Sequence, residues 1–181
     1  MNEATLSIQK AGESAGAGAE EGADKYVSPS PTLSLAEARK QLVALLSGED
    51  NLIANAANTS AFINTLLPDL NWVGFYFVEG DELVLGPFQG QPACVRIPIG
   101  RGVCGACVSL GATQRVRDVY AFPGHIACDV RSRSELVVPI RAAGHIVAVL
   151  DLDSPFQGRF GQREQDYVEA LASDFAEHQY R

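Results

Sequence analysis

Two pairs of apolar runs, each joined by a tight turn, constrain most strongly how this chain can fold. Residues 72–77 and 82–85 are rich in valine, leucine and aromatic side chains and lie on either side of Gly80. Residues 135–140 and 146–153 repeat this arrangement around a second glycine-containing turn. Such pairs are typical of β-hairpins, in which the two strands are antiparallel. The sequence therefore predicts an antiparallel sheet.

Helical patterns flank these strands. Ser34 and Glu37 form a capping-box sequence ahead of apolar residues at helical spacing. We expect a second amphipathic helix over residues 51–67, a short helix over 103–110 and a closing helix from about Gln162. Helices packed on an antiparallel sheet make an α+β fold.

The first 31 residues differ in composition from the rest of the chain. They are rich in alanine, glycine, glutamate and serine and contain few large apolar side chains. A segment of this kind cannot bury enough apolar surface to fold by itself. We therefore expect a flexible low-complexity tail over residues 1–31, with no role assigned to it, and one folded domain over residues 32–181.

The charge of the chain restricts its partners and its compartment. Lysine and arginine number 14 against 22 acidic residues, so the net charge is −8. This charge disfavours binding to nucleic acid or to an anionic membrane. We see neither a secretory signal nor an apolar run of membrane-spanning length. The expected location is the cytoplasm, where cysteines are kept reduced.

Four cysteines are the main chemical feature of the sequence. Cys128 lies between a histidine and an aspartate in a loop opened by Pro-Gly, and Cys94, Cys104 and Cys107 lie upstream. The Cys-x-x-Cys pair at 104 and 107 is typical of dithiol oxidoreductases, but these usually have parallel strands, and simple packing of Cys107 is the more ordinary interpretation. A four-cysteine zinc site would need a second closely spaced pair, so no metal is expected.

Acidic and aromatic side chains are predicted to gather on one face of the sheet. Asp151 and Asp153 are two residues apart on a strand and share a face, and Glu135 opens the neighbouring hairpin strand. Three converging carboxyl groups raise one another's pKa, so they can hold an ammonium group and also donate a proton. Trp72 and Tyr76 also share a face. Solvated strand ends and core packing are the ordinary alternatives.

Six segments together resemble the free methionine-(R)-sulfoxide reductases, which are single GAF domains. These segments are NWVGFY (71–76), LGPFQG (85–90), ACVRI (93–97), GRGVCG (100–105), GHIACD (124–129) and VLDLDS (149–154). The resemblance covers roughly residues 34–175 and implies a GAF fold. Ordinary signalling GAF domains lack the set of three cysteines at 94, 104 and 128.

The resemblance also implies roles for these cysteines in reducing free L-methionine (R)-S-oxide to L-methionine. Cys128 would attack the sulfoxide sulfur and become a sulfenic acid, while Cys94 and Cys104 would be resolving or recycling thiols. A disulfide would form and thioredoxin would reduce it, without a metal or an organic cofactor. Cys107 lies outside this set.

The remaining site residues are expected to bind the substrate. Glu135 with Asp151 or Asp153 would protonate the sulfoxide oxygen and pair with the ammonium group of a free amino acid. A peptide-bound residue lacks that ammonium and would leave the buried charges unpaired. Trp72 and Tyr76 would form the wall around the S-methyl group.

Two other functions remain open at this point. A GAF domain could instead be a non-enzymatic sensor that binds a small ligand in the same pocket. Cys128 and His125 could also serve a Cys-His amidase, which would hydrolyse its substrate without oxidising a thiol. Because GAF domains often pair through their outer helices, we expect a homodimer.

Overall fold

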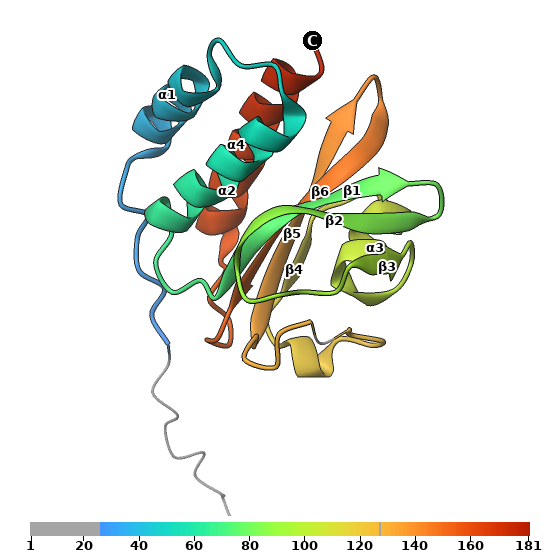
Figure 1. Cartoon of the computed structure of the whole chain (residues 1–181). Coiled ribbons are helices and arrows are strands. Elements are labelled where there is room, and N and C mark those ends of the chain that lie inside the picture. The colour runs from blue at the N-terminus through green and yellow to red at the C-terminus, as the bar shows by residue number, and fades with distance from the viewer. Residues whose placement is uncertain (1–25, 127) are drawn as a thin grey trace, which may run out of the picture.

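The computed structural model describes residues 26–126 and 128–181, which form a six-stranded antiparallel sheet with helices on both faces (Figure 1). The sheet order is β3-β2-β1-β6-β5-β4. Helices α1, α2 and α4 cover one face, and α3 lies on the other. In chain order the elements are α1 (Leu35–Leu46), α2 (Leu52–Leu66), β1 (Trp72–Glu79), β2 (Glu82–Gly90), β3 (Arg96–Pro98), α3 (Gly102–Leu110), β4 (Gln114–Val116), a 3-10 turn (Val119–Ala121), β5 (Ser134–Ala142), β6 (His145–Ser154) and α4 (Gln162–Gln179). The predicted α+β architecture is confirmed.

Both predicted hairpins are present. In the first, Glu79 of β1 pairs with Glu82 of β2 across a two-residue turn that includes Gly80 at φ 65°. In the second, Ala142 of β5 pairs with His145 of β6. Pairing of β1 with β6 then joins the two hairpins into one sheet.

The helices begin and end where their capping residues indicate. The Ser34 hydroxyl accepts a hydrogen bond from the Glu37 N–H, and the Glu37 carboxylate accepts one from the Ser34 N–H, which completes the capping box of α1. The Asn51 side chain caps α2. Gly111 ends α3 in the left-handed conformation, at φ 66°.

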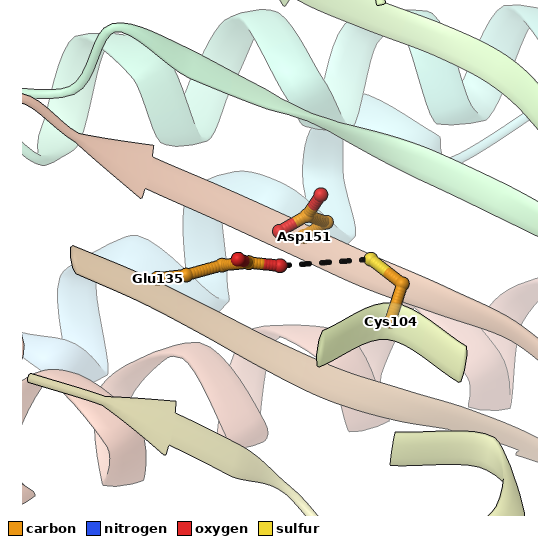
Figure 2. Close-up of side chains that lie close together, drawn as sticks. All are labelled: Cys104, Glu135 and Asp151. Atoms are coloured by element: carbon orange, nitrogen blue, oxygen red, sulfur yellow. Dashed lines mark hydrogen bonds between the residues drawn. The ribbon is translucent and has the colours of Figure 1, made fainter. Parts of the chain in front are cut away.

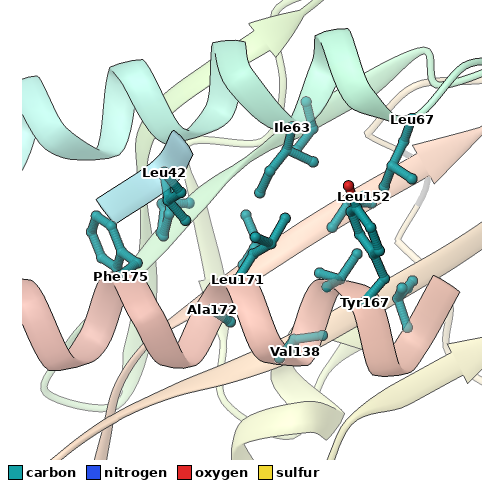
Figure 3. Packing of buried hydrophobic residues seen from close by; sticks show 14 of the residues in the cluster. Leu42, Ile63, Leu67, Val138, Leu152, Tyr167, Leu171, Ala172 and Phe175 are labelled. Atoms are coloured by element: carbon teal, nitrogen blue, oxygen red, sulfur yellow. The ribbon is translucent and has the colours of Figure 1, made fainter. Parts of the chain in front are cut away.

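The main hydrophobic core fills the space between the sheet and helices α1, α2 and α4 (Figure 3). Leu42 of α1, Ile63 of α2 and Leu171 of α4 are fully buried in this core, where α2 packs on β1 and β2 and α4 packs on β5. Burying one such side chain stabilises the fold by about 1.5–3 kcal/mol. Because this face is filled, the polar residues predicted for a site lie on the opposite face, beneath α3.

Side-chain hydrogen bonds hold the segment before α1 against the domain. The Tyr26 hydroxyl donates to Asp69 at 2.7 Å, and the buried Arg159 donates to the Ser28 hydroxyl at 2.7 Å. Residues 26–31 of the predicted tail therefore contact the folded body, while residues 1–25 lie outside the described residues. Within the described part of the chain, no helix has the length and hydropathy needed to cross a membrane.

Candidate functional site

The hairpin β5–β6 brings the three predicted carboxyl groups together. Glu135 of β5 pairs directly with Asp153 of β6, and Asp151 lies two residues along the same strand. Side chains two residues apart share a face of a sheet. Glu135 and Asp151 are each only 6% exposed and Asp153 is half-buried, and all three line one small cavity together with the first residues of α3.

Helix α3 places a thiol against this carboxyl cluster. Cys104 lies in the first turn of α3, and its Sγ is 3.9 Å from Glu135 Oε1 (Figure 2). Burial, with the nearby Asp151 and Glu135, raises the pKa of Cys104 well above its usual range, so this thiol keeps its proton. Cys107, in the next turn, is fully buried with its Sγ 3.6 Å from Val137 O, in agreement with a packing role.

Burial also makes the carboxyl groups hold protons near neutral pH. It raises the pKa of Asp151 to about 7. The pKa of Glu135 lies well above its usual range, first because of burial and then because of Asp151 and Asp153. Burial and the neighbouring Asp151 raise the pKa of Asp153 in the same way. The cluster can therefore donate a proton, and it can also accept a cation.

A disulfide joins two of the predicted cysteines at the edge of this cluster. Cys94, between β2 and β3, is bonded to Cys128, which precedes β5, and their Cα atoms are 5.3 Å apart. The Tyr76 hydroxyl donates to the carbonyl of Cys94 at 3.0 Å. The rings of Trp72 and Tyr76 stack with their centroids 5.8 Å apart. The structure thus places both predicted aromatic residues beside the thiol loops.

A polar network that the sequence did not indicate holds the loop of Cys128. The Asn71 amide donates to Asp129 Oδ2 and to the Ser132 hydroxyl, both at 3.0 Å. Arg131 also binds Asp129, at 2.7 Å, and its hydrogen bond holds the pKa of Asp129 well below its usual range. Asn71 directly precedes β1, but no periodic pattern connects it with a loop that begins fifty residues later.

His125 lies beside Glu135. Its Nδ1 is 4.0 Å from Glu135 Oε2, is buried and has no hydrogen-bond partner. Burial lowers the pKa of His125, so the imidazole is neutral. The sequence suggested His125 as a partner for Cys128, whereas the structure also brings it to the carboxyl cluster.

The space among these groups is small in the disulfide form. Cys104, Cys128, Glu135 and Asp151 line a cavity of about 30 Å³. A second cavity of about 10 Å³ lies between Trp72 and Cys128. A cavity needs about 10–15 Å³ of space open to a water-sized sphere to hold one water, so the first cavity has room for a water or an ion. Larger hollows of about 550 and 660 Å³ lie elsewhere, along α4 and beside the segment before α1.

Comparisons with known proteins agree with this geometry. The family model described as GAF domain matches residues 42–178. The free methionine-R-sulfoxide reductase of Escherichia coli is 49% identical over 138 residues, which are 76% of this chain and 84% of that protein. The structure of fRMsr of Staphylococcus aureus in complex with substrate is 44% identical, with a TM-score of 0.78 and coverage of 86% of this chain and 99% of that one. The free methionine-R-sulfoxide reductase from Neisseria meningitidis, also in complex with its substrate, is 39% identical, with a TM-score of 0.78 and coverage of 86% and 96%. This chain belongs to the GAF-domain family of free methionine-R-sulfoxide reductases.

Proposed function

We propose that this protein reduces free L-methionine (R)-S-oxide to L-methionine through cysteine sulfenic acid and disulfide chemistry. The observation that carries the proposal is the disulfide of Cys94 and Cys128 beside a cluster of three carboxyl groups, of which Glu135 and Asp151 are buried and Asp153 is half-buried. Relatives named for this activity, two of them solved with substrate, support it. A plain binding module has no need of an oxidisable thiol pair next to a proton donor.

Cys128 is the attacking thiolate in this proposal. A thiolate is a far better nucleophile than a thiol, and carboxyl groups around a buried cysteine disfavour the thiolate. Cys104 has such an environment, because its Sγ lies against Glu135 and the residue is only 3% exposed. Cys128 is half-buried in a loop and is already paired with a second cysteine. These environments favour Cys128 over Cys104 as the nucleophile.

The carboxyl cluster supplies the proton that a sulfoxide oxygen needs. The Cys128 sulfur attacks the sulfoxide sulfur, a protonated Glu135 or Asp151 donates to the oxygen, and the oxygen moves to Cys128 as the S–O bond of the substrate breaks. Methionine leaves, and Cys128 remains as a sulfenic acid. The raised pKa values of both carboxyl groups keep a proton available near neutral pH.

Cys94 then resolves the sulfenic acid. Its thiol attacks the Cys128 sulfur, the disulfide forms and the oxygen leaves as water, so the two electrons come from the two cysteines. Cys104 lines the same cavity as Cys128 and is the proposed further recycling thiol. Thioredoxin is the proposed reductant. Val95 directly follows Cys94 and Val130 lies two residues after Cys128, and both are exposed and offer apolar surface to such a partner.

The same carboxyl groups select a free amino acid. Once one of the three holds the catalytic proton, the others can pair with the substrate ammonium, which a peptide-bound methionine sulfoxide lacks. Trp72 and Tyr76 line the second small cavity with Asp151 and Asp153. Their stacked rings are the proposed contact for the S-methyl group.

Single-turnover mixing tests this function. The reduced protein is mixed with the free R epimer, the free S epimer and an N-acetylated R analogue, and both methionine formed and thiols lost are counted. We expect product from the free R epimer alone, with two thiols lost per methionine. Methionine from none of the three would make the pocket a sensor site, and hydrolysis without thiol loss would favour the amidase.

Two variants separate the roles of the bonded cysteines. Cys128→Ser should form no methionine, because the nucleophile is gone. Cys94→Ser should still form about one methionine per chain and then stop, with a sulfenic acid that a dione probe traps. Cys107→Ser is the matched control, because the buried Cys107 contacts the Val137 carbonyl and lines neither cavity of the site, so it should keep full turnover. Repeated turnover by Cys94→Ser with thioredoxin would contradict the resolving role.

We further propose that the domain, bounded at residues 32–181, works as a homodimer in a reducing, cytoplasm-like compartment. The free thiols of Cys104 and Cys107 support the proposal of a reducing compartment.

Exposed apolar side chains on the outer helices support the proposed homodimer. Val43 and Leu45 on α1, with Ile53 on α2, are 41–57% exposed. Light scattering during gel filtration should give twice the chain mass, and a monomer at all concentrations would reject the dimer.

A further inference from the structure

The buried cluster beneath α3 contains a set of ligand atoms that the reduction of a sulfoxide does not fully use. Cys104 Sγ, one oxygen of Glu135 and one oxygen of Asp151 lie within 4.8 Å of one another, and all three residues are buried. Figure 2 shows the three side chains pointing toward a common centre. They come from three separate elements, α3, β5 and β6, so the fold itself holds them together.

One atom of this set lacks a partner. Asp151 is only 6% exposed, so it is more than nine-tenths buried, yet its Oδ1 makes no hydrogen bond. A buried polar atom without a partner is costly, and a water or an ion usually satisfies it. His125 adds a second such atom, because its Nδ1 is buried, unpartnered and 4.0 Å from Glu135 Oε2.

The distances suit a tetrahedral metal ion. Zinc binds cysteine sulfur at about 2.3 Å and carboxylate oxygen at about 2.1 Å, so tetrahedral angles place sulfur and oxygen about 3.6 Å apart. Cys104 Sγ and Glu135 Oε1 are 3.9 Å apart, and small side-chain rotations close that gap. The adjoining cavity of about 30 Å³ has room for one ion.

Charge also favours a cation here. Within residues 26–126 and 128–181, no ion pair involves Asp151 or Asp153, and the one basic side chain near Glu135 is His125, with its Nδ1 4.0 Å from Glu135 Oε2. Asp129, which also lines the cavity, is already paired with Arg131. Metal binding displaces the protons that the Cys104 thiol and the two carboxyl groups otherwise hold. The resulting thiolate with two carboxylates suits a borderline-soft divalent ion better than magnesium or calcium, which prefer oxygen ligands alone.

We propose that Cys104, Glu135 and Asp151 form a binding site for one Zn²⁺ ion, with His125 Nδ1 beside them as the nearest further donor. The ion is not a cofactor of the reduction. It occupies the position proposed for the substrate ammonium and therefore excludes the substrate. This site differs from the four-cysteine zinc site that the sequence disfavoured, because it needs only one cysteine.

Metal titration of the full, untagged chain in its disulfide form tests the site. In that form Cys104 and Cys107 are the free thiols, so metal cannot bind to Cys94 or Cys128. Zn²⁺ is titrated against a chromophoric chelator, and Co²⁺ is used to detect sulfur ligation by its thiolate-to-metal absorption band. We expect one ion per chain with that band. Neither substrate nor reductant is present, so the outcome is independent of the proposed activity.

Variants show whether the ion uses these ligands. Cys104→Ser should bind at least tenfold more weakly and lose the absorption band, and Asp151→Asn should bind at least tenfold more weakly. Cys107→Ser, three residues along the same helix, should keep both affinity and band. Circular dichroism checks that each variant is folded. If Cys104→Ser does not fold, Asp151→Asn still tests the site. No binding by the parent chain, or equal losses in Cys107→Ser, would overturn the proposal.

Discussion

At the scale of single residues, the site consists of groups that the folded protein stabilises poorly by itself. Asp151 is buried, and its Oδ1 lacks a hydrogen bond. Two more carboxyl groups lie beside it, and the histidine next to Glu135 is neutral because burial lowers its pKa. Such an arrangement is costly without a ligand. That cost is the physical reason to assign the cluster to binding and proton transfer rather than to stability.

The cost should appear as a pH dependence of stability. In the folded protein the Asp151 carboxyl keeps its proton up to about pH 7. In the unfolded chain the same carboxyl loses its proton near pH 4. The folded state therefore binds more protons between these values, and the free energy of unfolding falls as pH rises from about 4 to about 7. Asp151→Asn should remove up to about 3 kcal/mol of this fall between pH 5 and pH 8.

Urea unfolding at pH 5 and pH 8 measures this difference. Both proteins are kept in the disulfide form, and Asp81→Asn, in an exposed turn, serves as the control. The Asp151→Asn variant should gain stability relative to the parent chain as pH rises, and the control should not. A parallel pH dependence in all three proteins would show that Asp151 titrates normally in the fold.

At the scale of elements, strand β1 supports the aromatic side of the site through one glycine. A Cβ on Gly74 would lie 2.7 Å from the ring of Trp72 and would also collide with Phe88 of β2. Trp72 stacks on Phe88 and on Tyr76, with centroids 5.3 and 5.8 Å apart. Gly74 thus allows the three rings to pack beside the Cys128 loop.

Gly74→Ala should therefore displace Trp72. Overpacking of this kind costs about 1–3 kcal/mol. We expect a lower urea midpoint, a shifted emission of Trp72, which is the one tryptophan in the sequence, and a raised KM for the sulfoxide. Gly144→Asn is the control, because this turn glycine has φ 83° with open space around it, and asparagine tolerates that conformation. An unchanged emission in Gly74→Ala would disprove the role of this contact.

The sequence predicted a helix or strand well where the residues that determine it are close together in the chain. Both hairpins and the capping box of α1 follow from neighbouring residues, so the sequence was sufficient for them. Strand β4 has only three residues and carries no periodic pattern. Strand β2 continues to Gly90 through a Gly-Pro pair that usually marks a loop. The pairing of Cys94 with Cys128 spans 34 residues between two loops, where only the resemblance to a family offered guidance.

At the scale of the whole molecule, one face of the sheet carries stability and the other carries chemistry. Helices α1, α2 and α4 bury the large apolar core on the first face. On the second face α3 and the two cysteine loops enclose the carboxyl cluster. The sheet thus separates the thiols from the main core.

The disulfide form should not bind the substrate. The cavity beside Cys128 is about 30 Å³, which is far too small for an amino acid, and the bond to Cys94 holds the loop over it. The reduced loop is free of that bond. Calorimetry can compare the oxidised parent chain with reduced Cys128→Ser, which cannot react. We expect free methionine (R)-sulfoxide to bind the reduced variant at least tenfold more tightly. Equal affinities would mean that the site is open in both states and that disulfide formation does not expel the product.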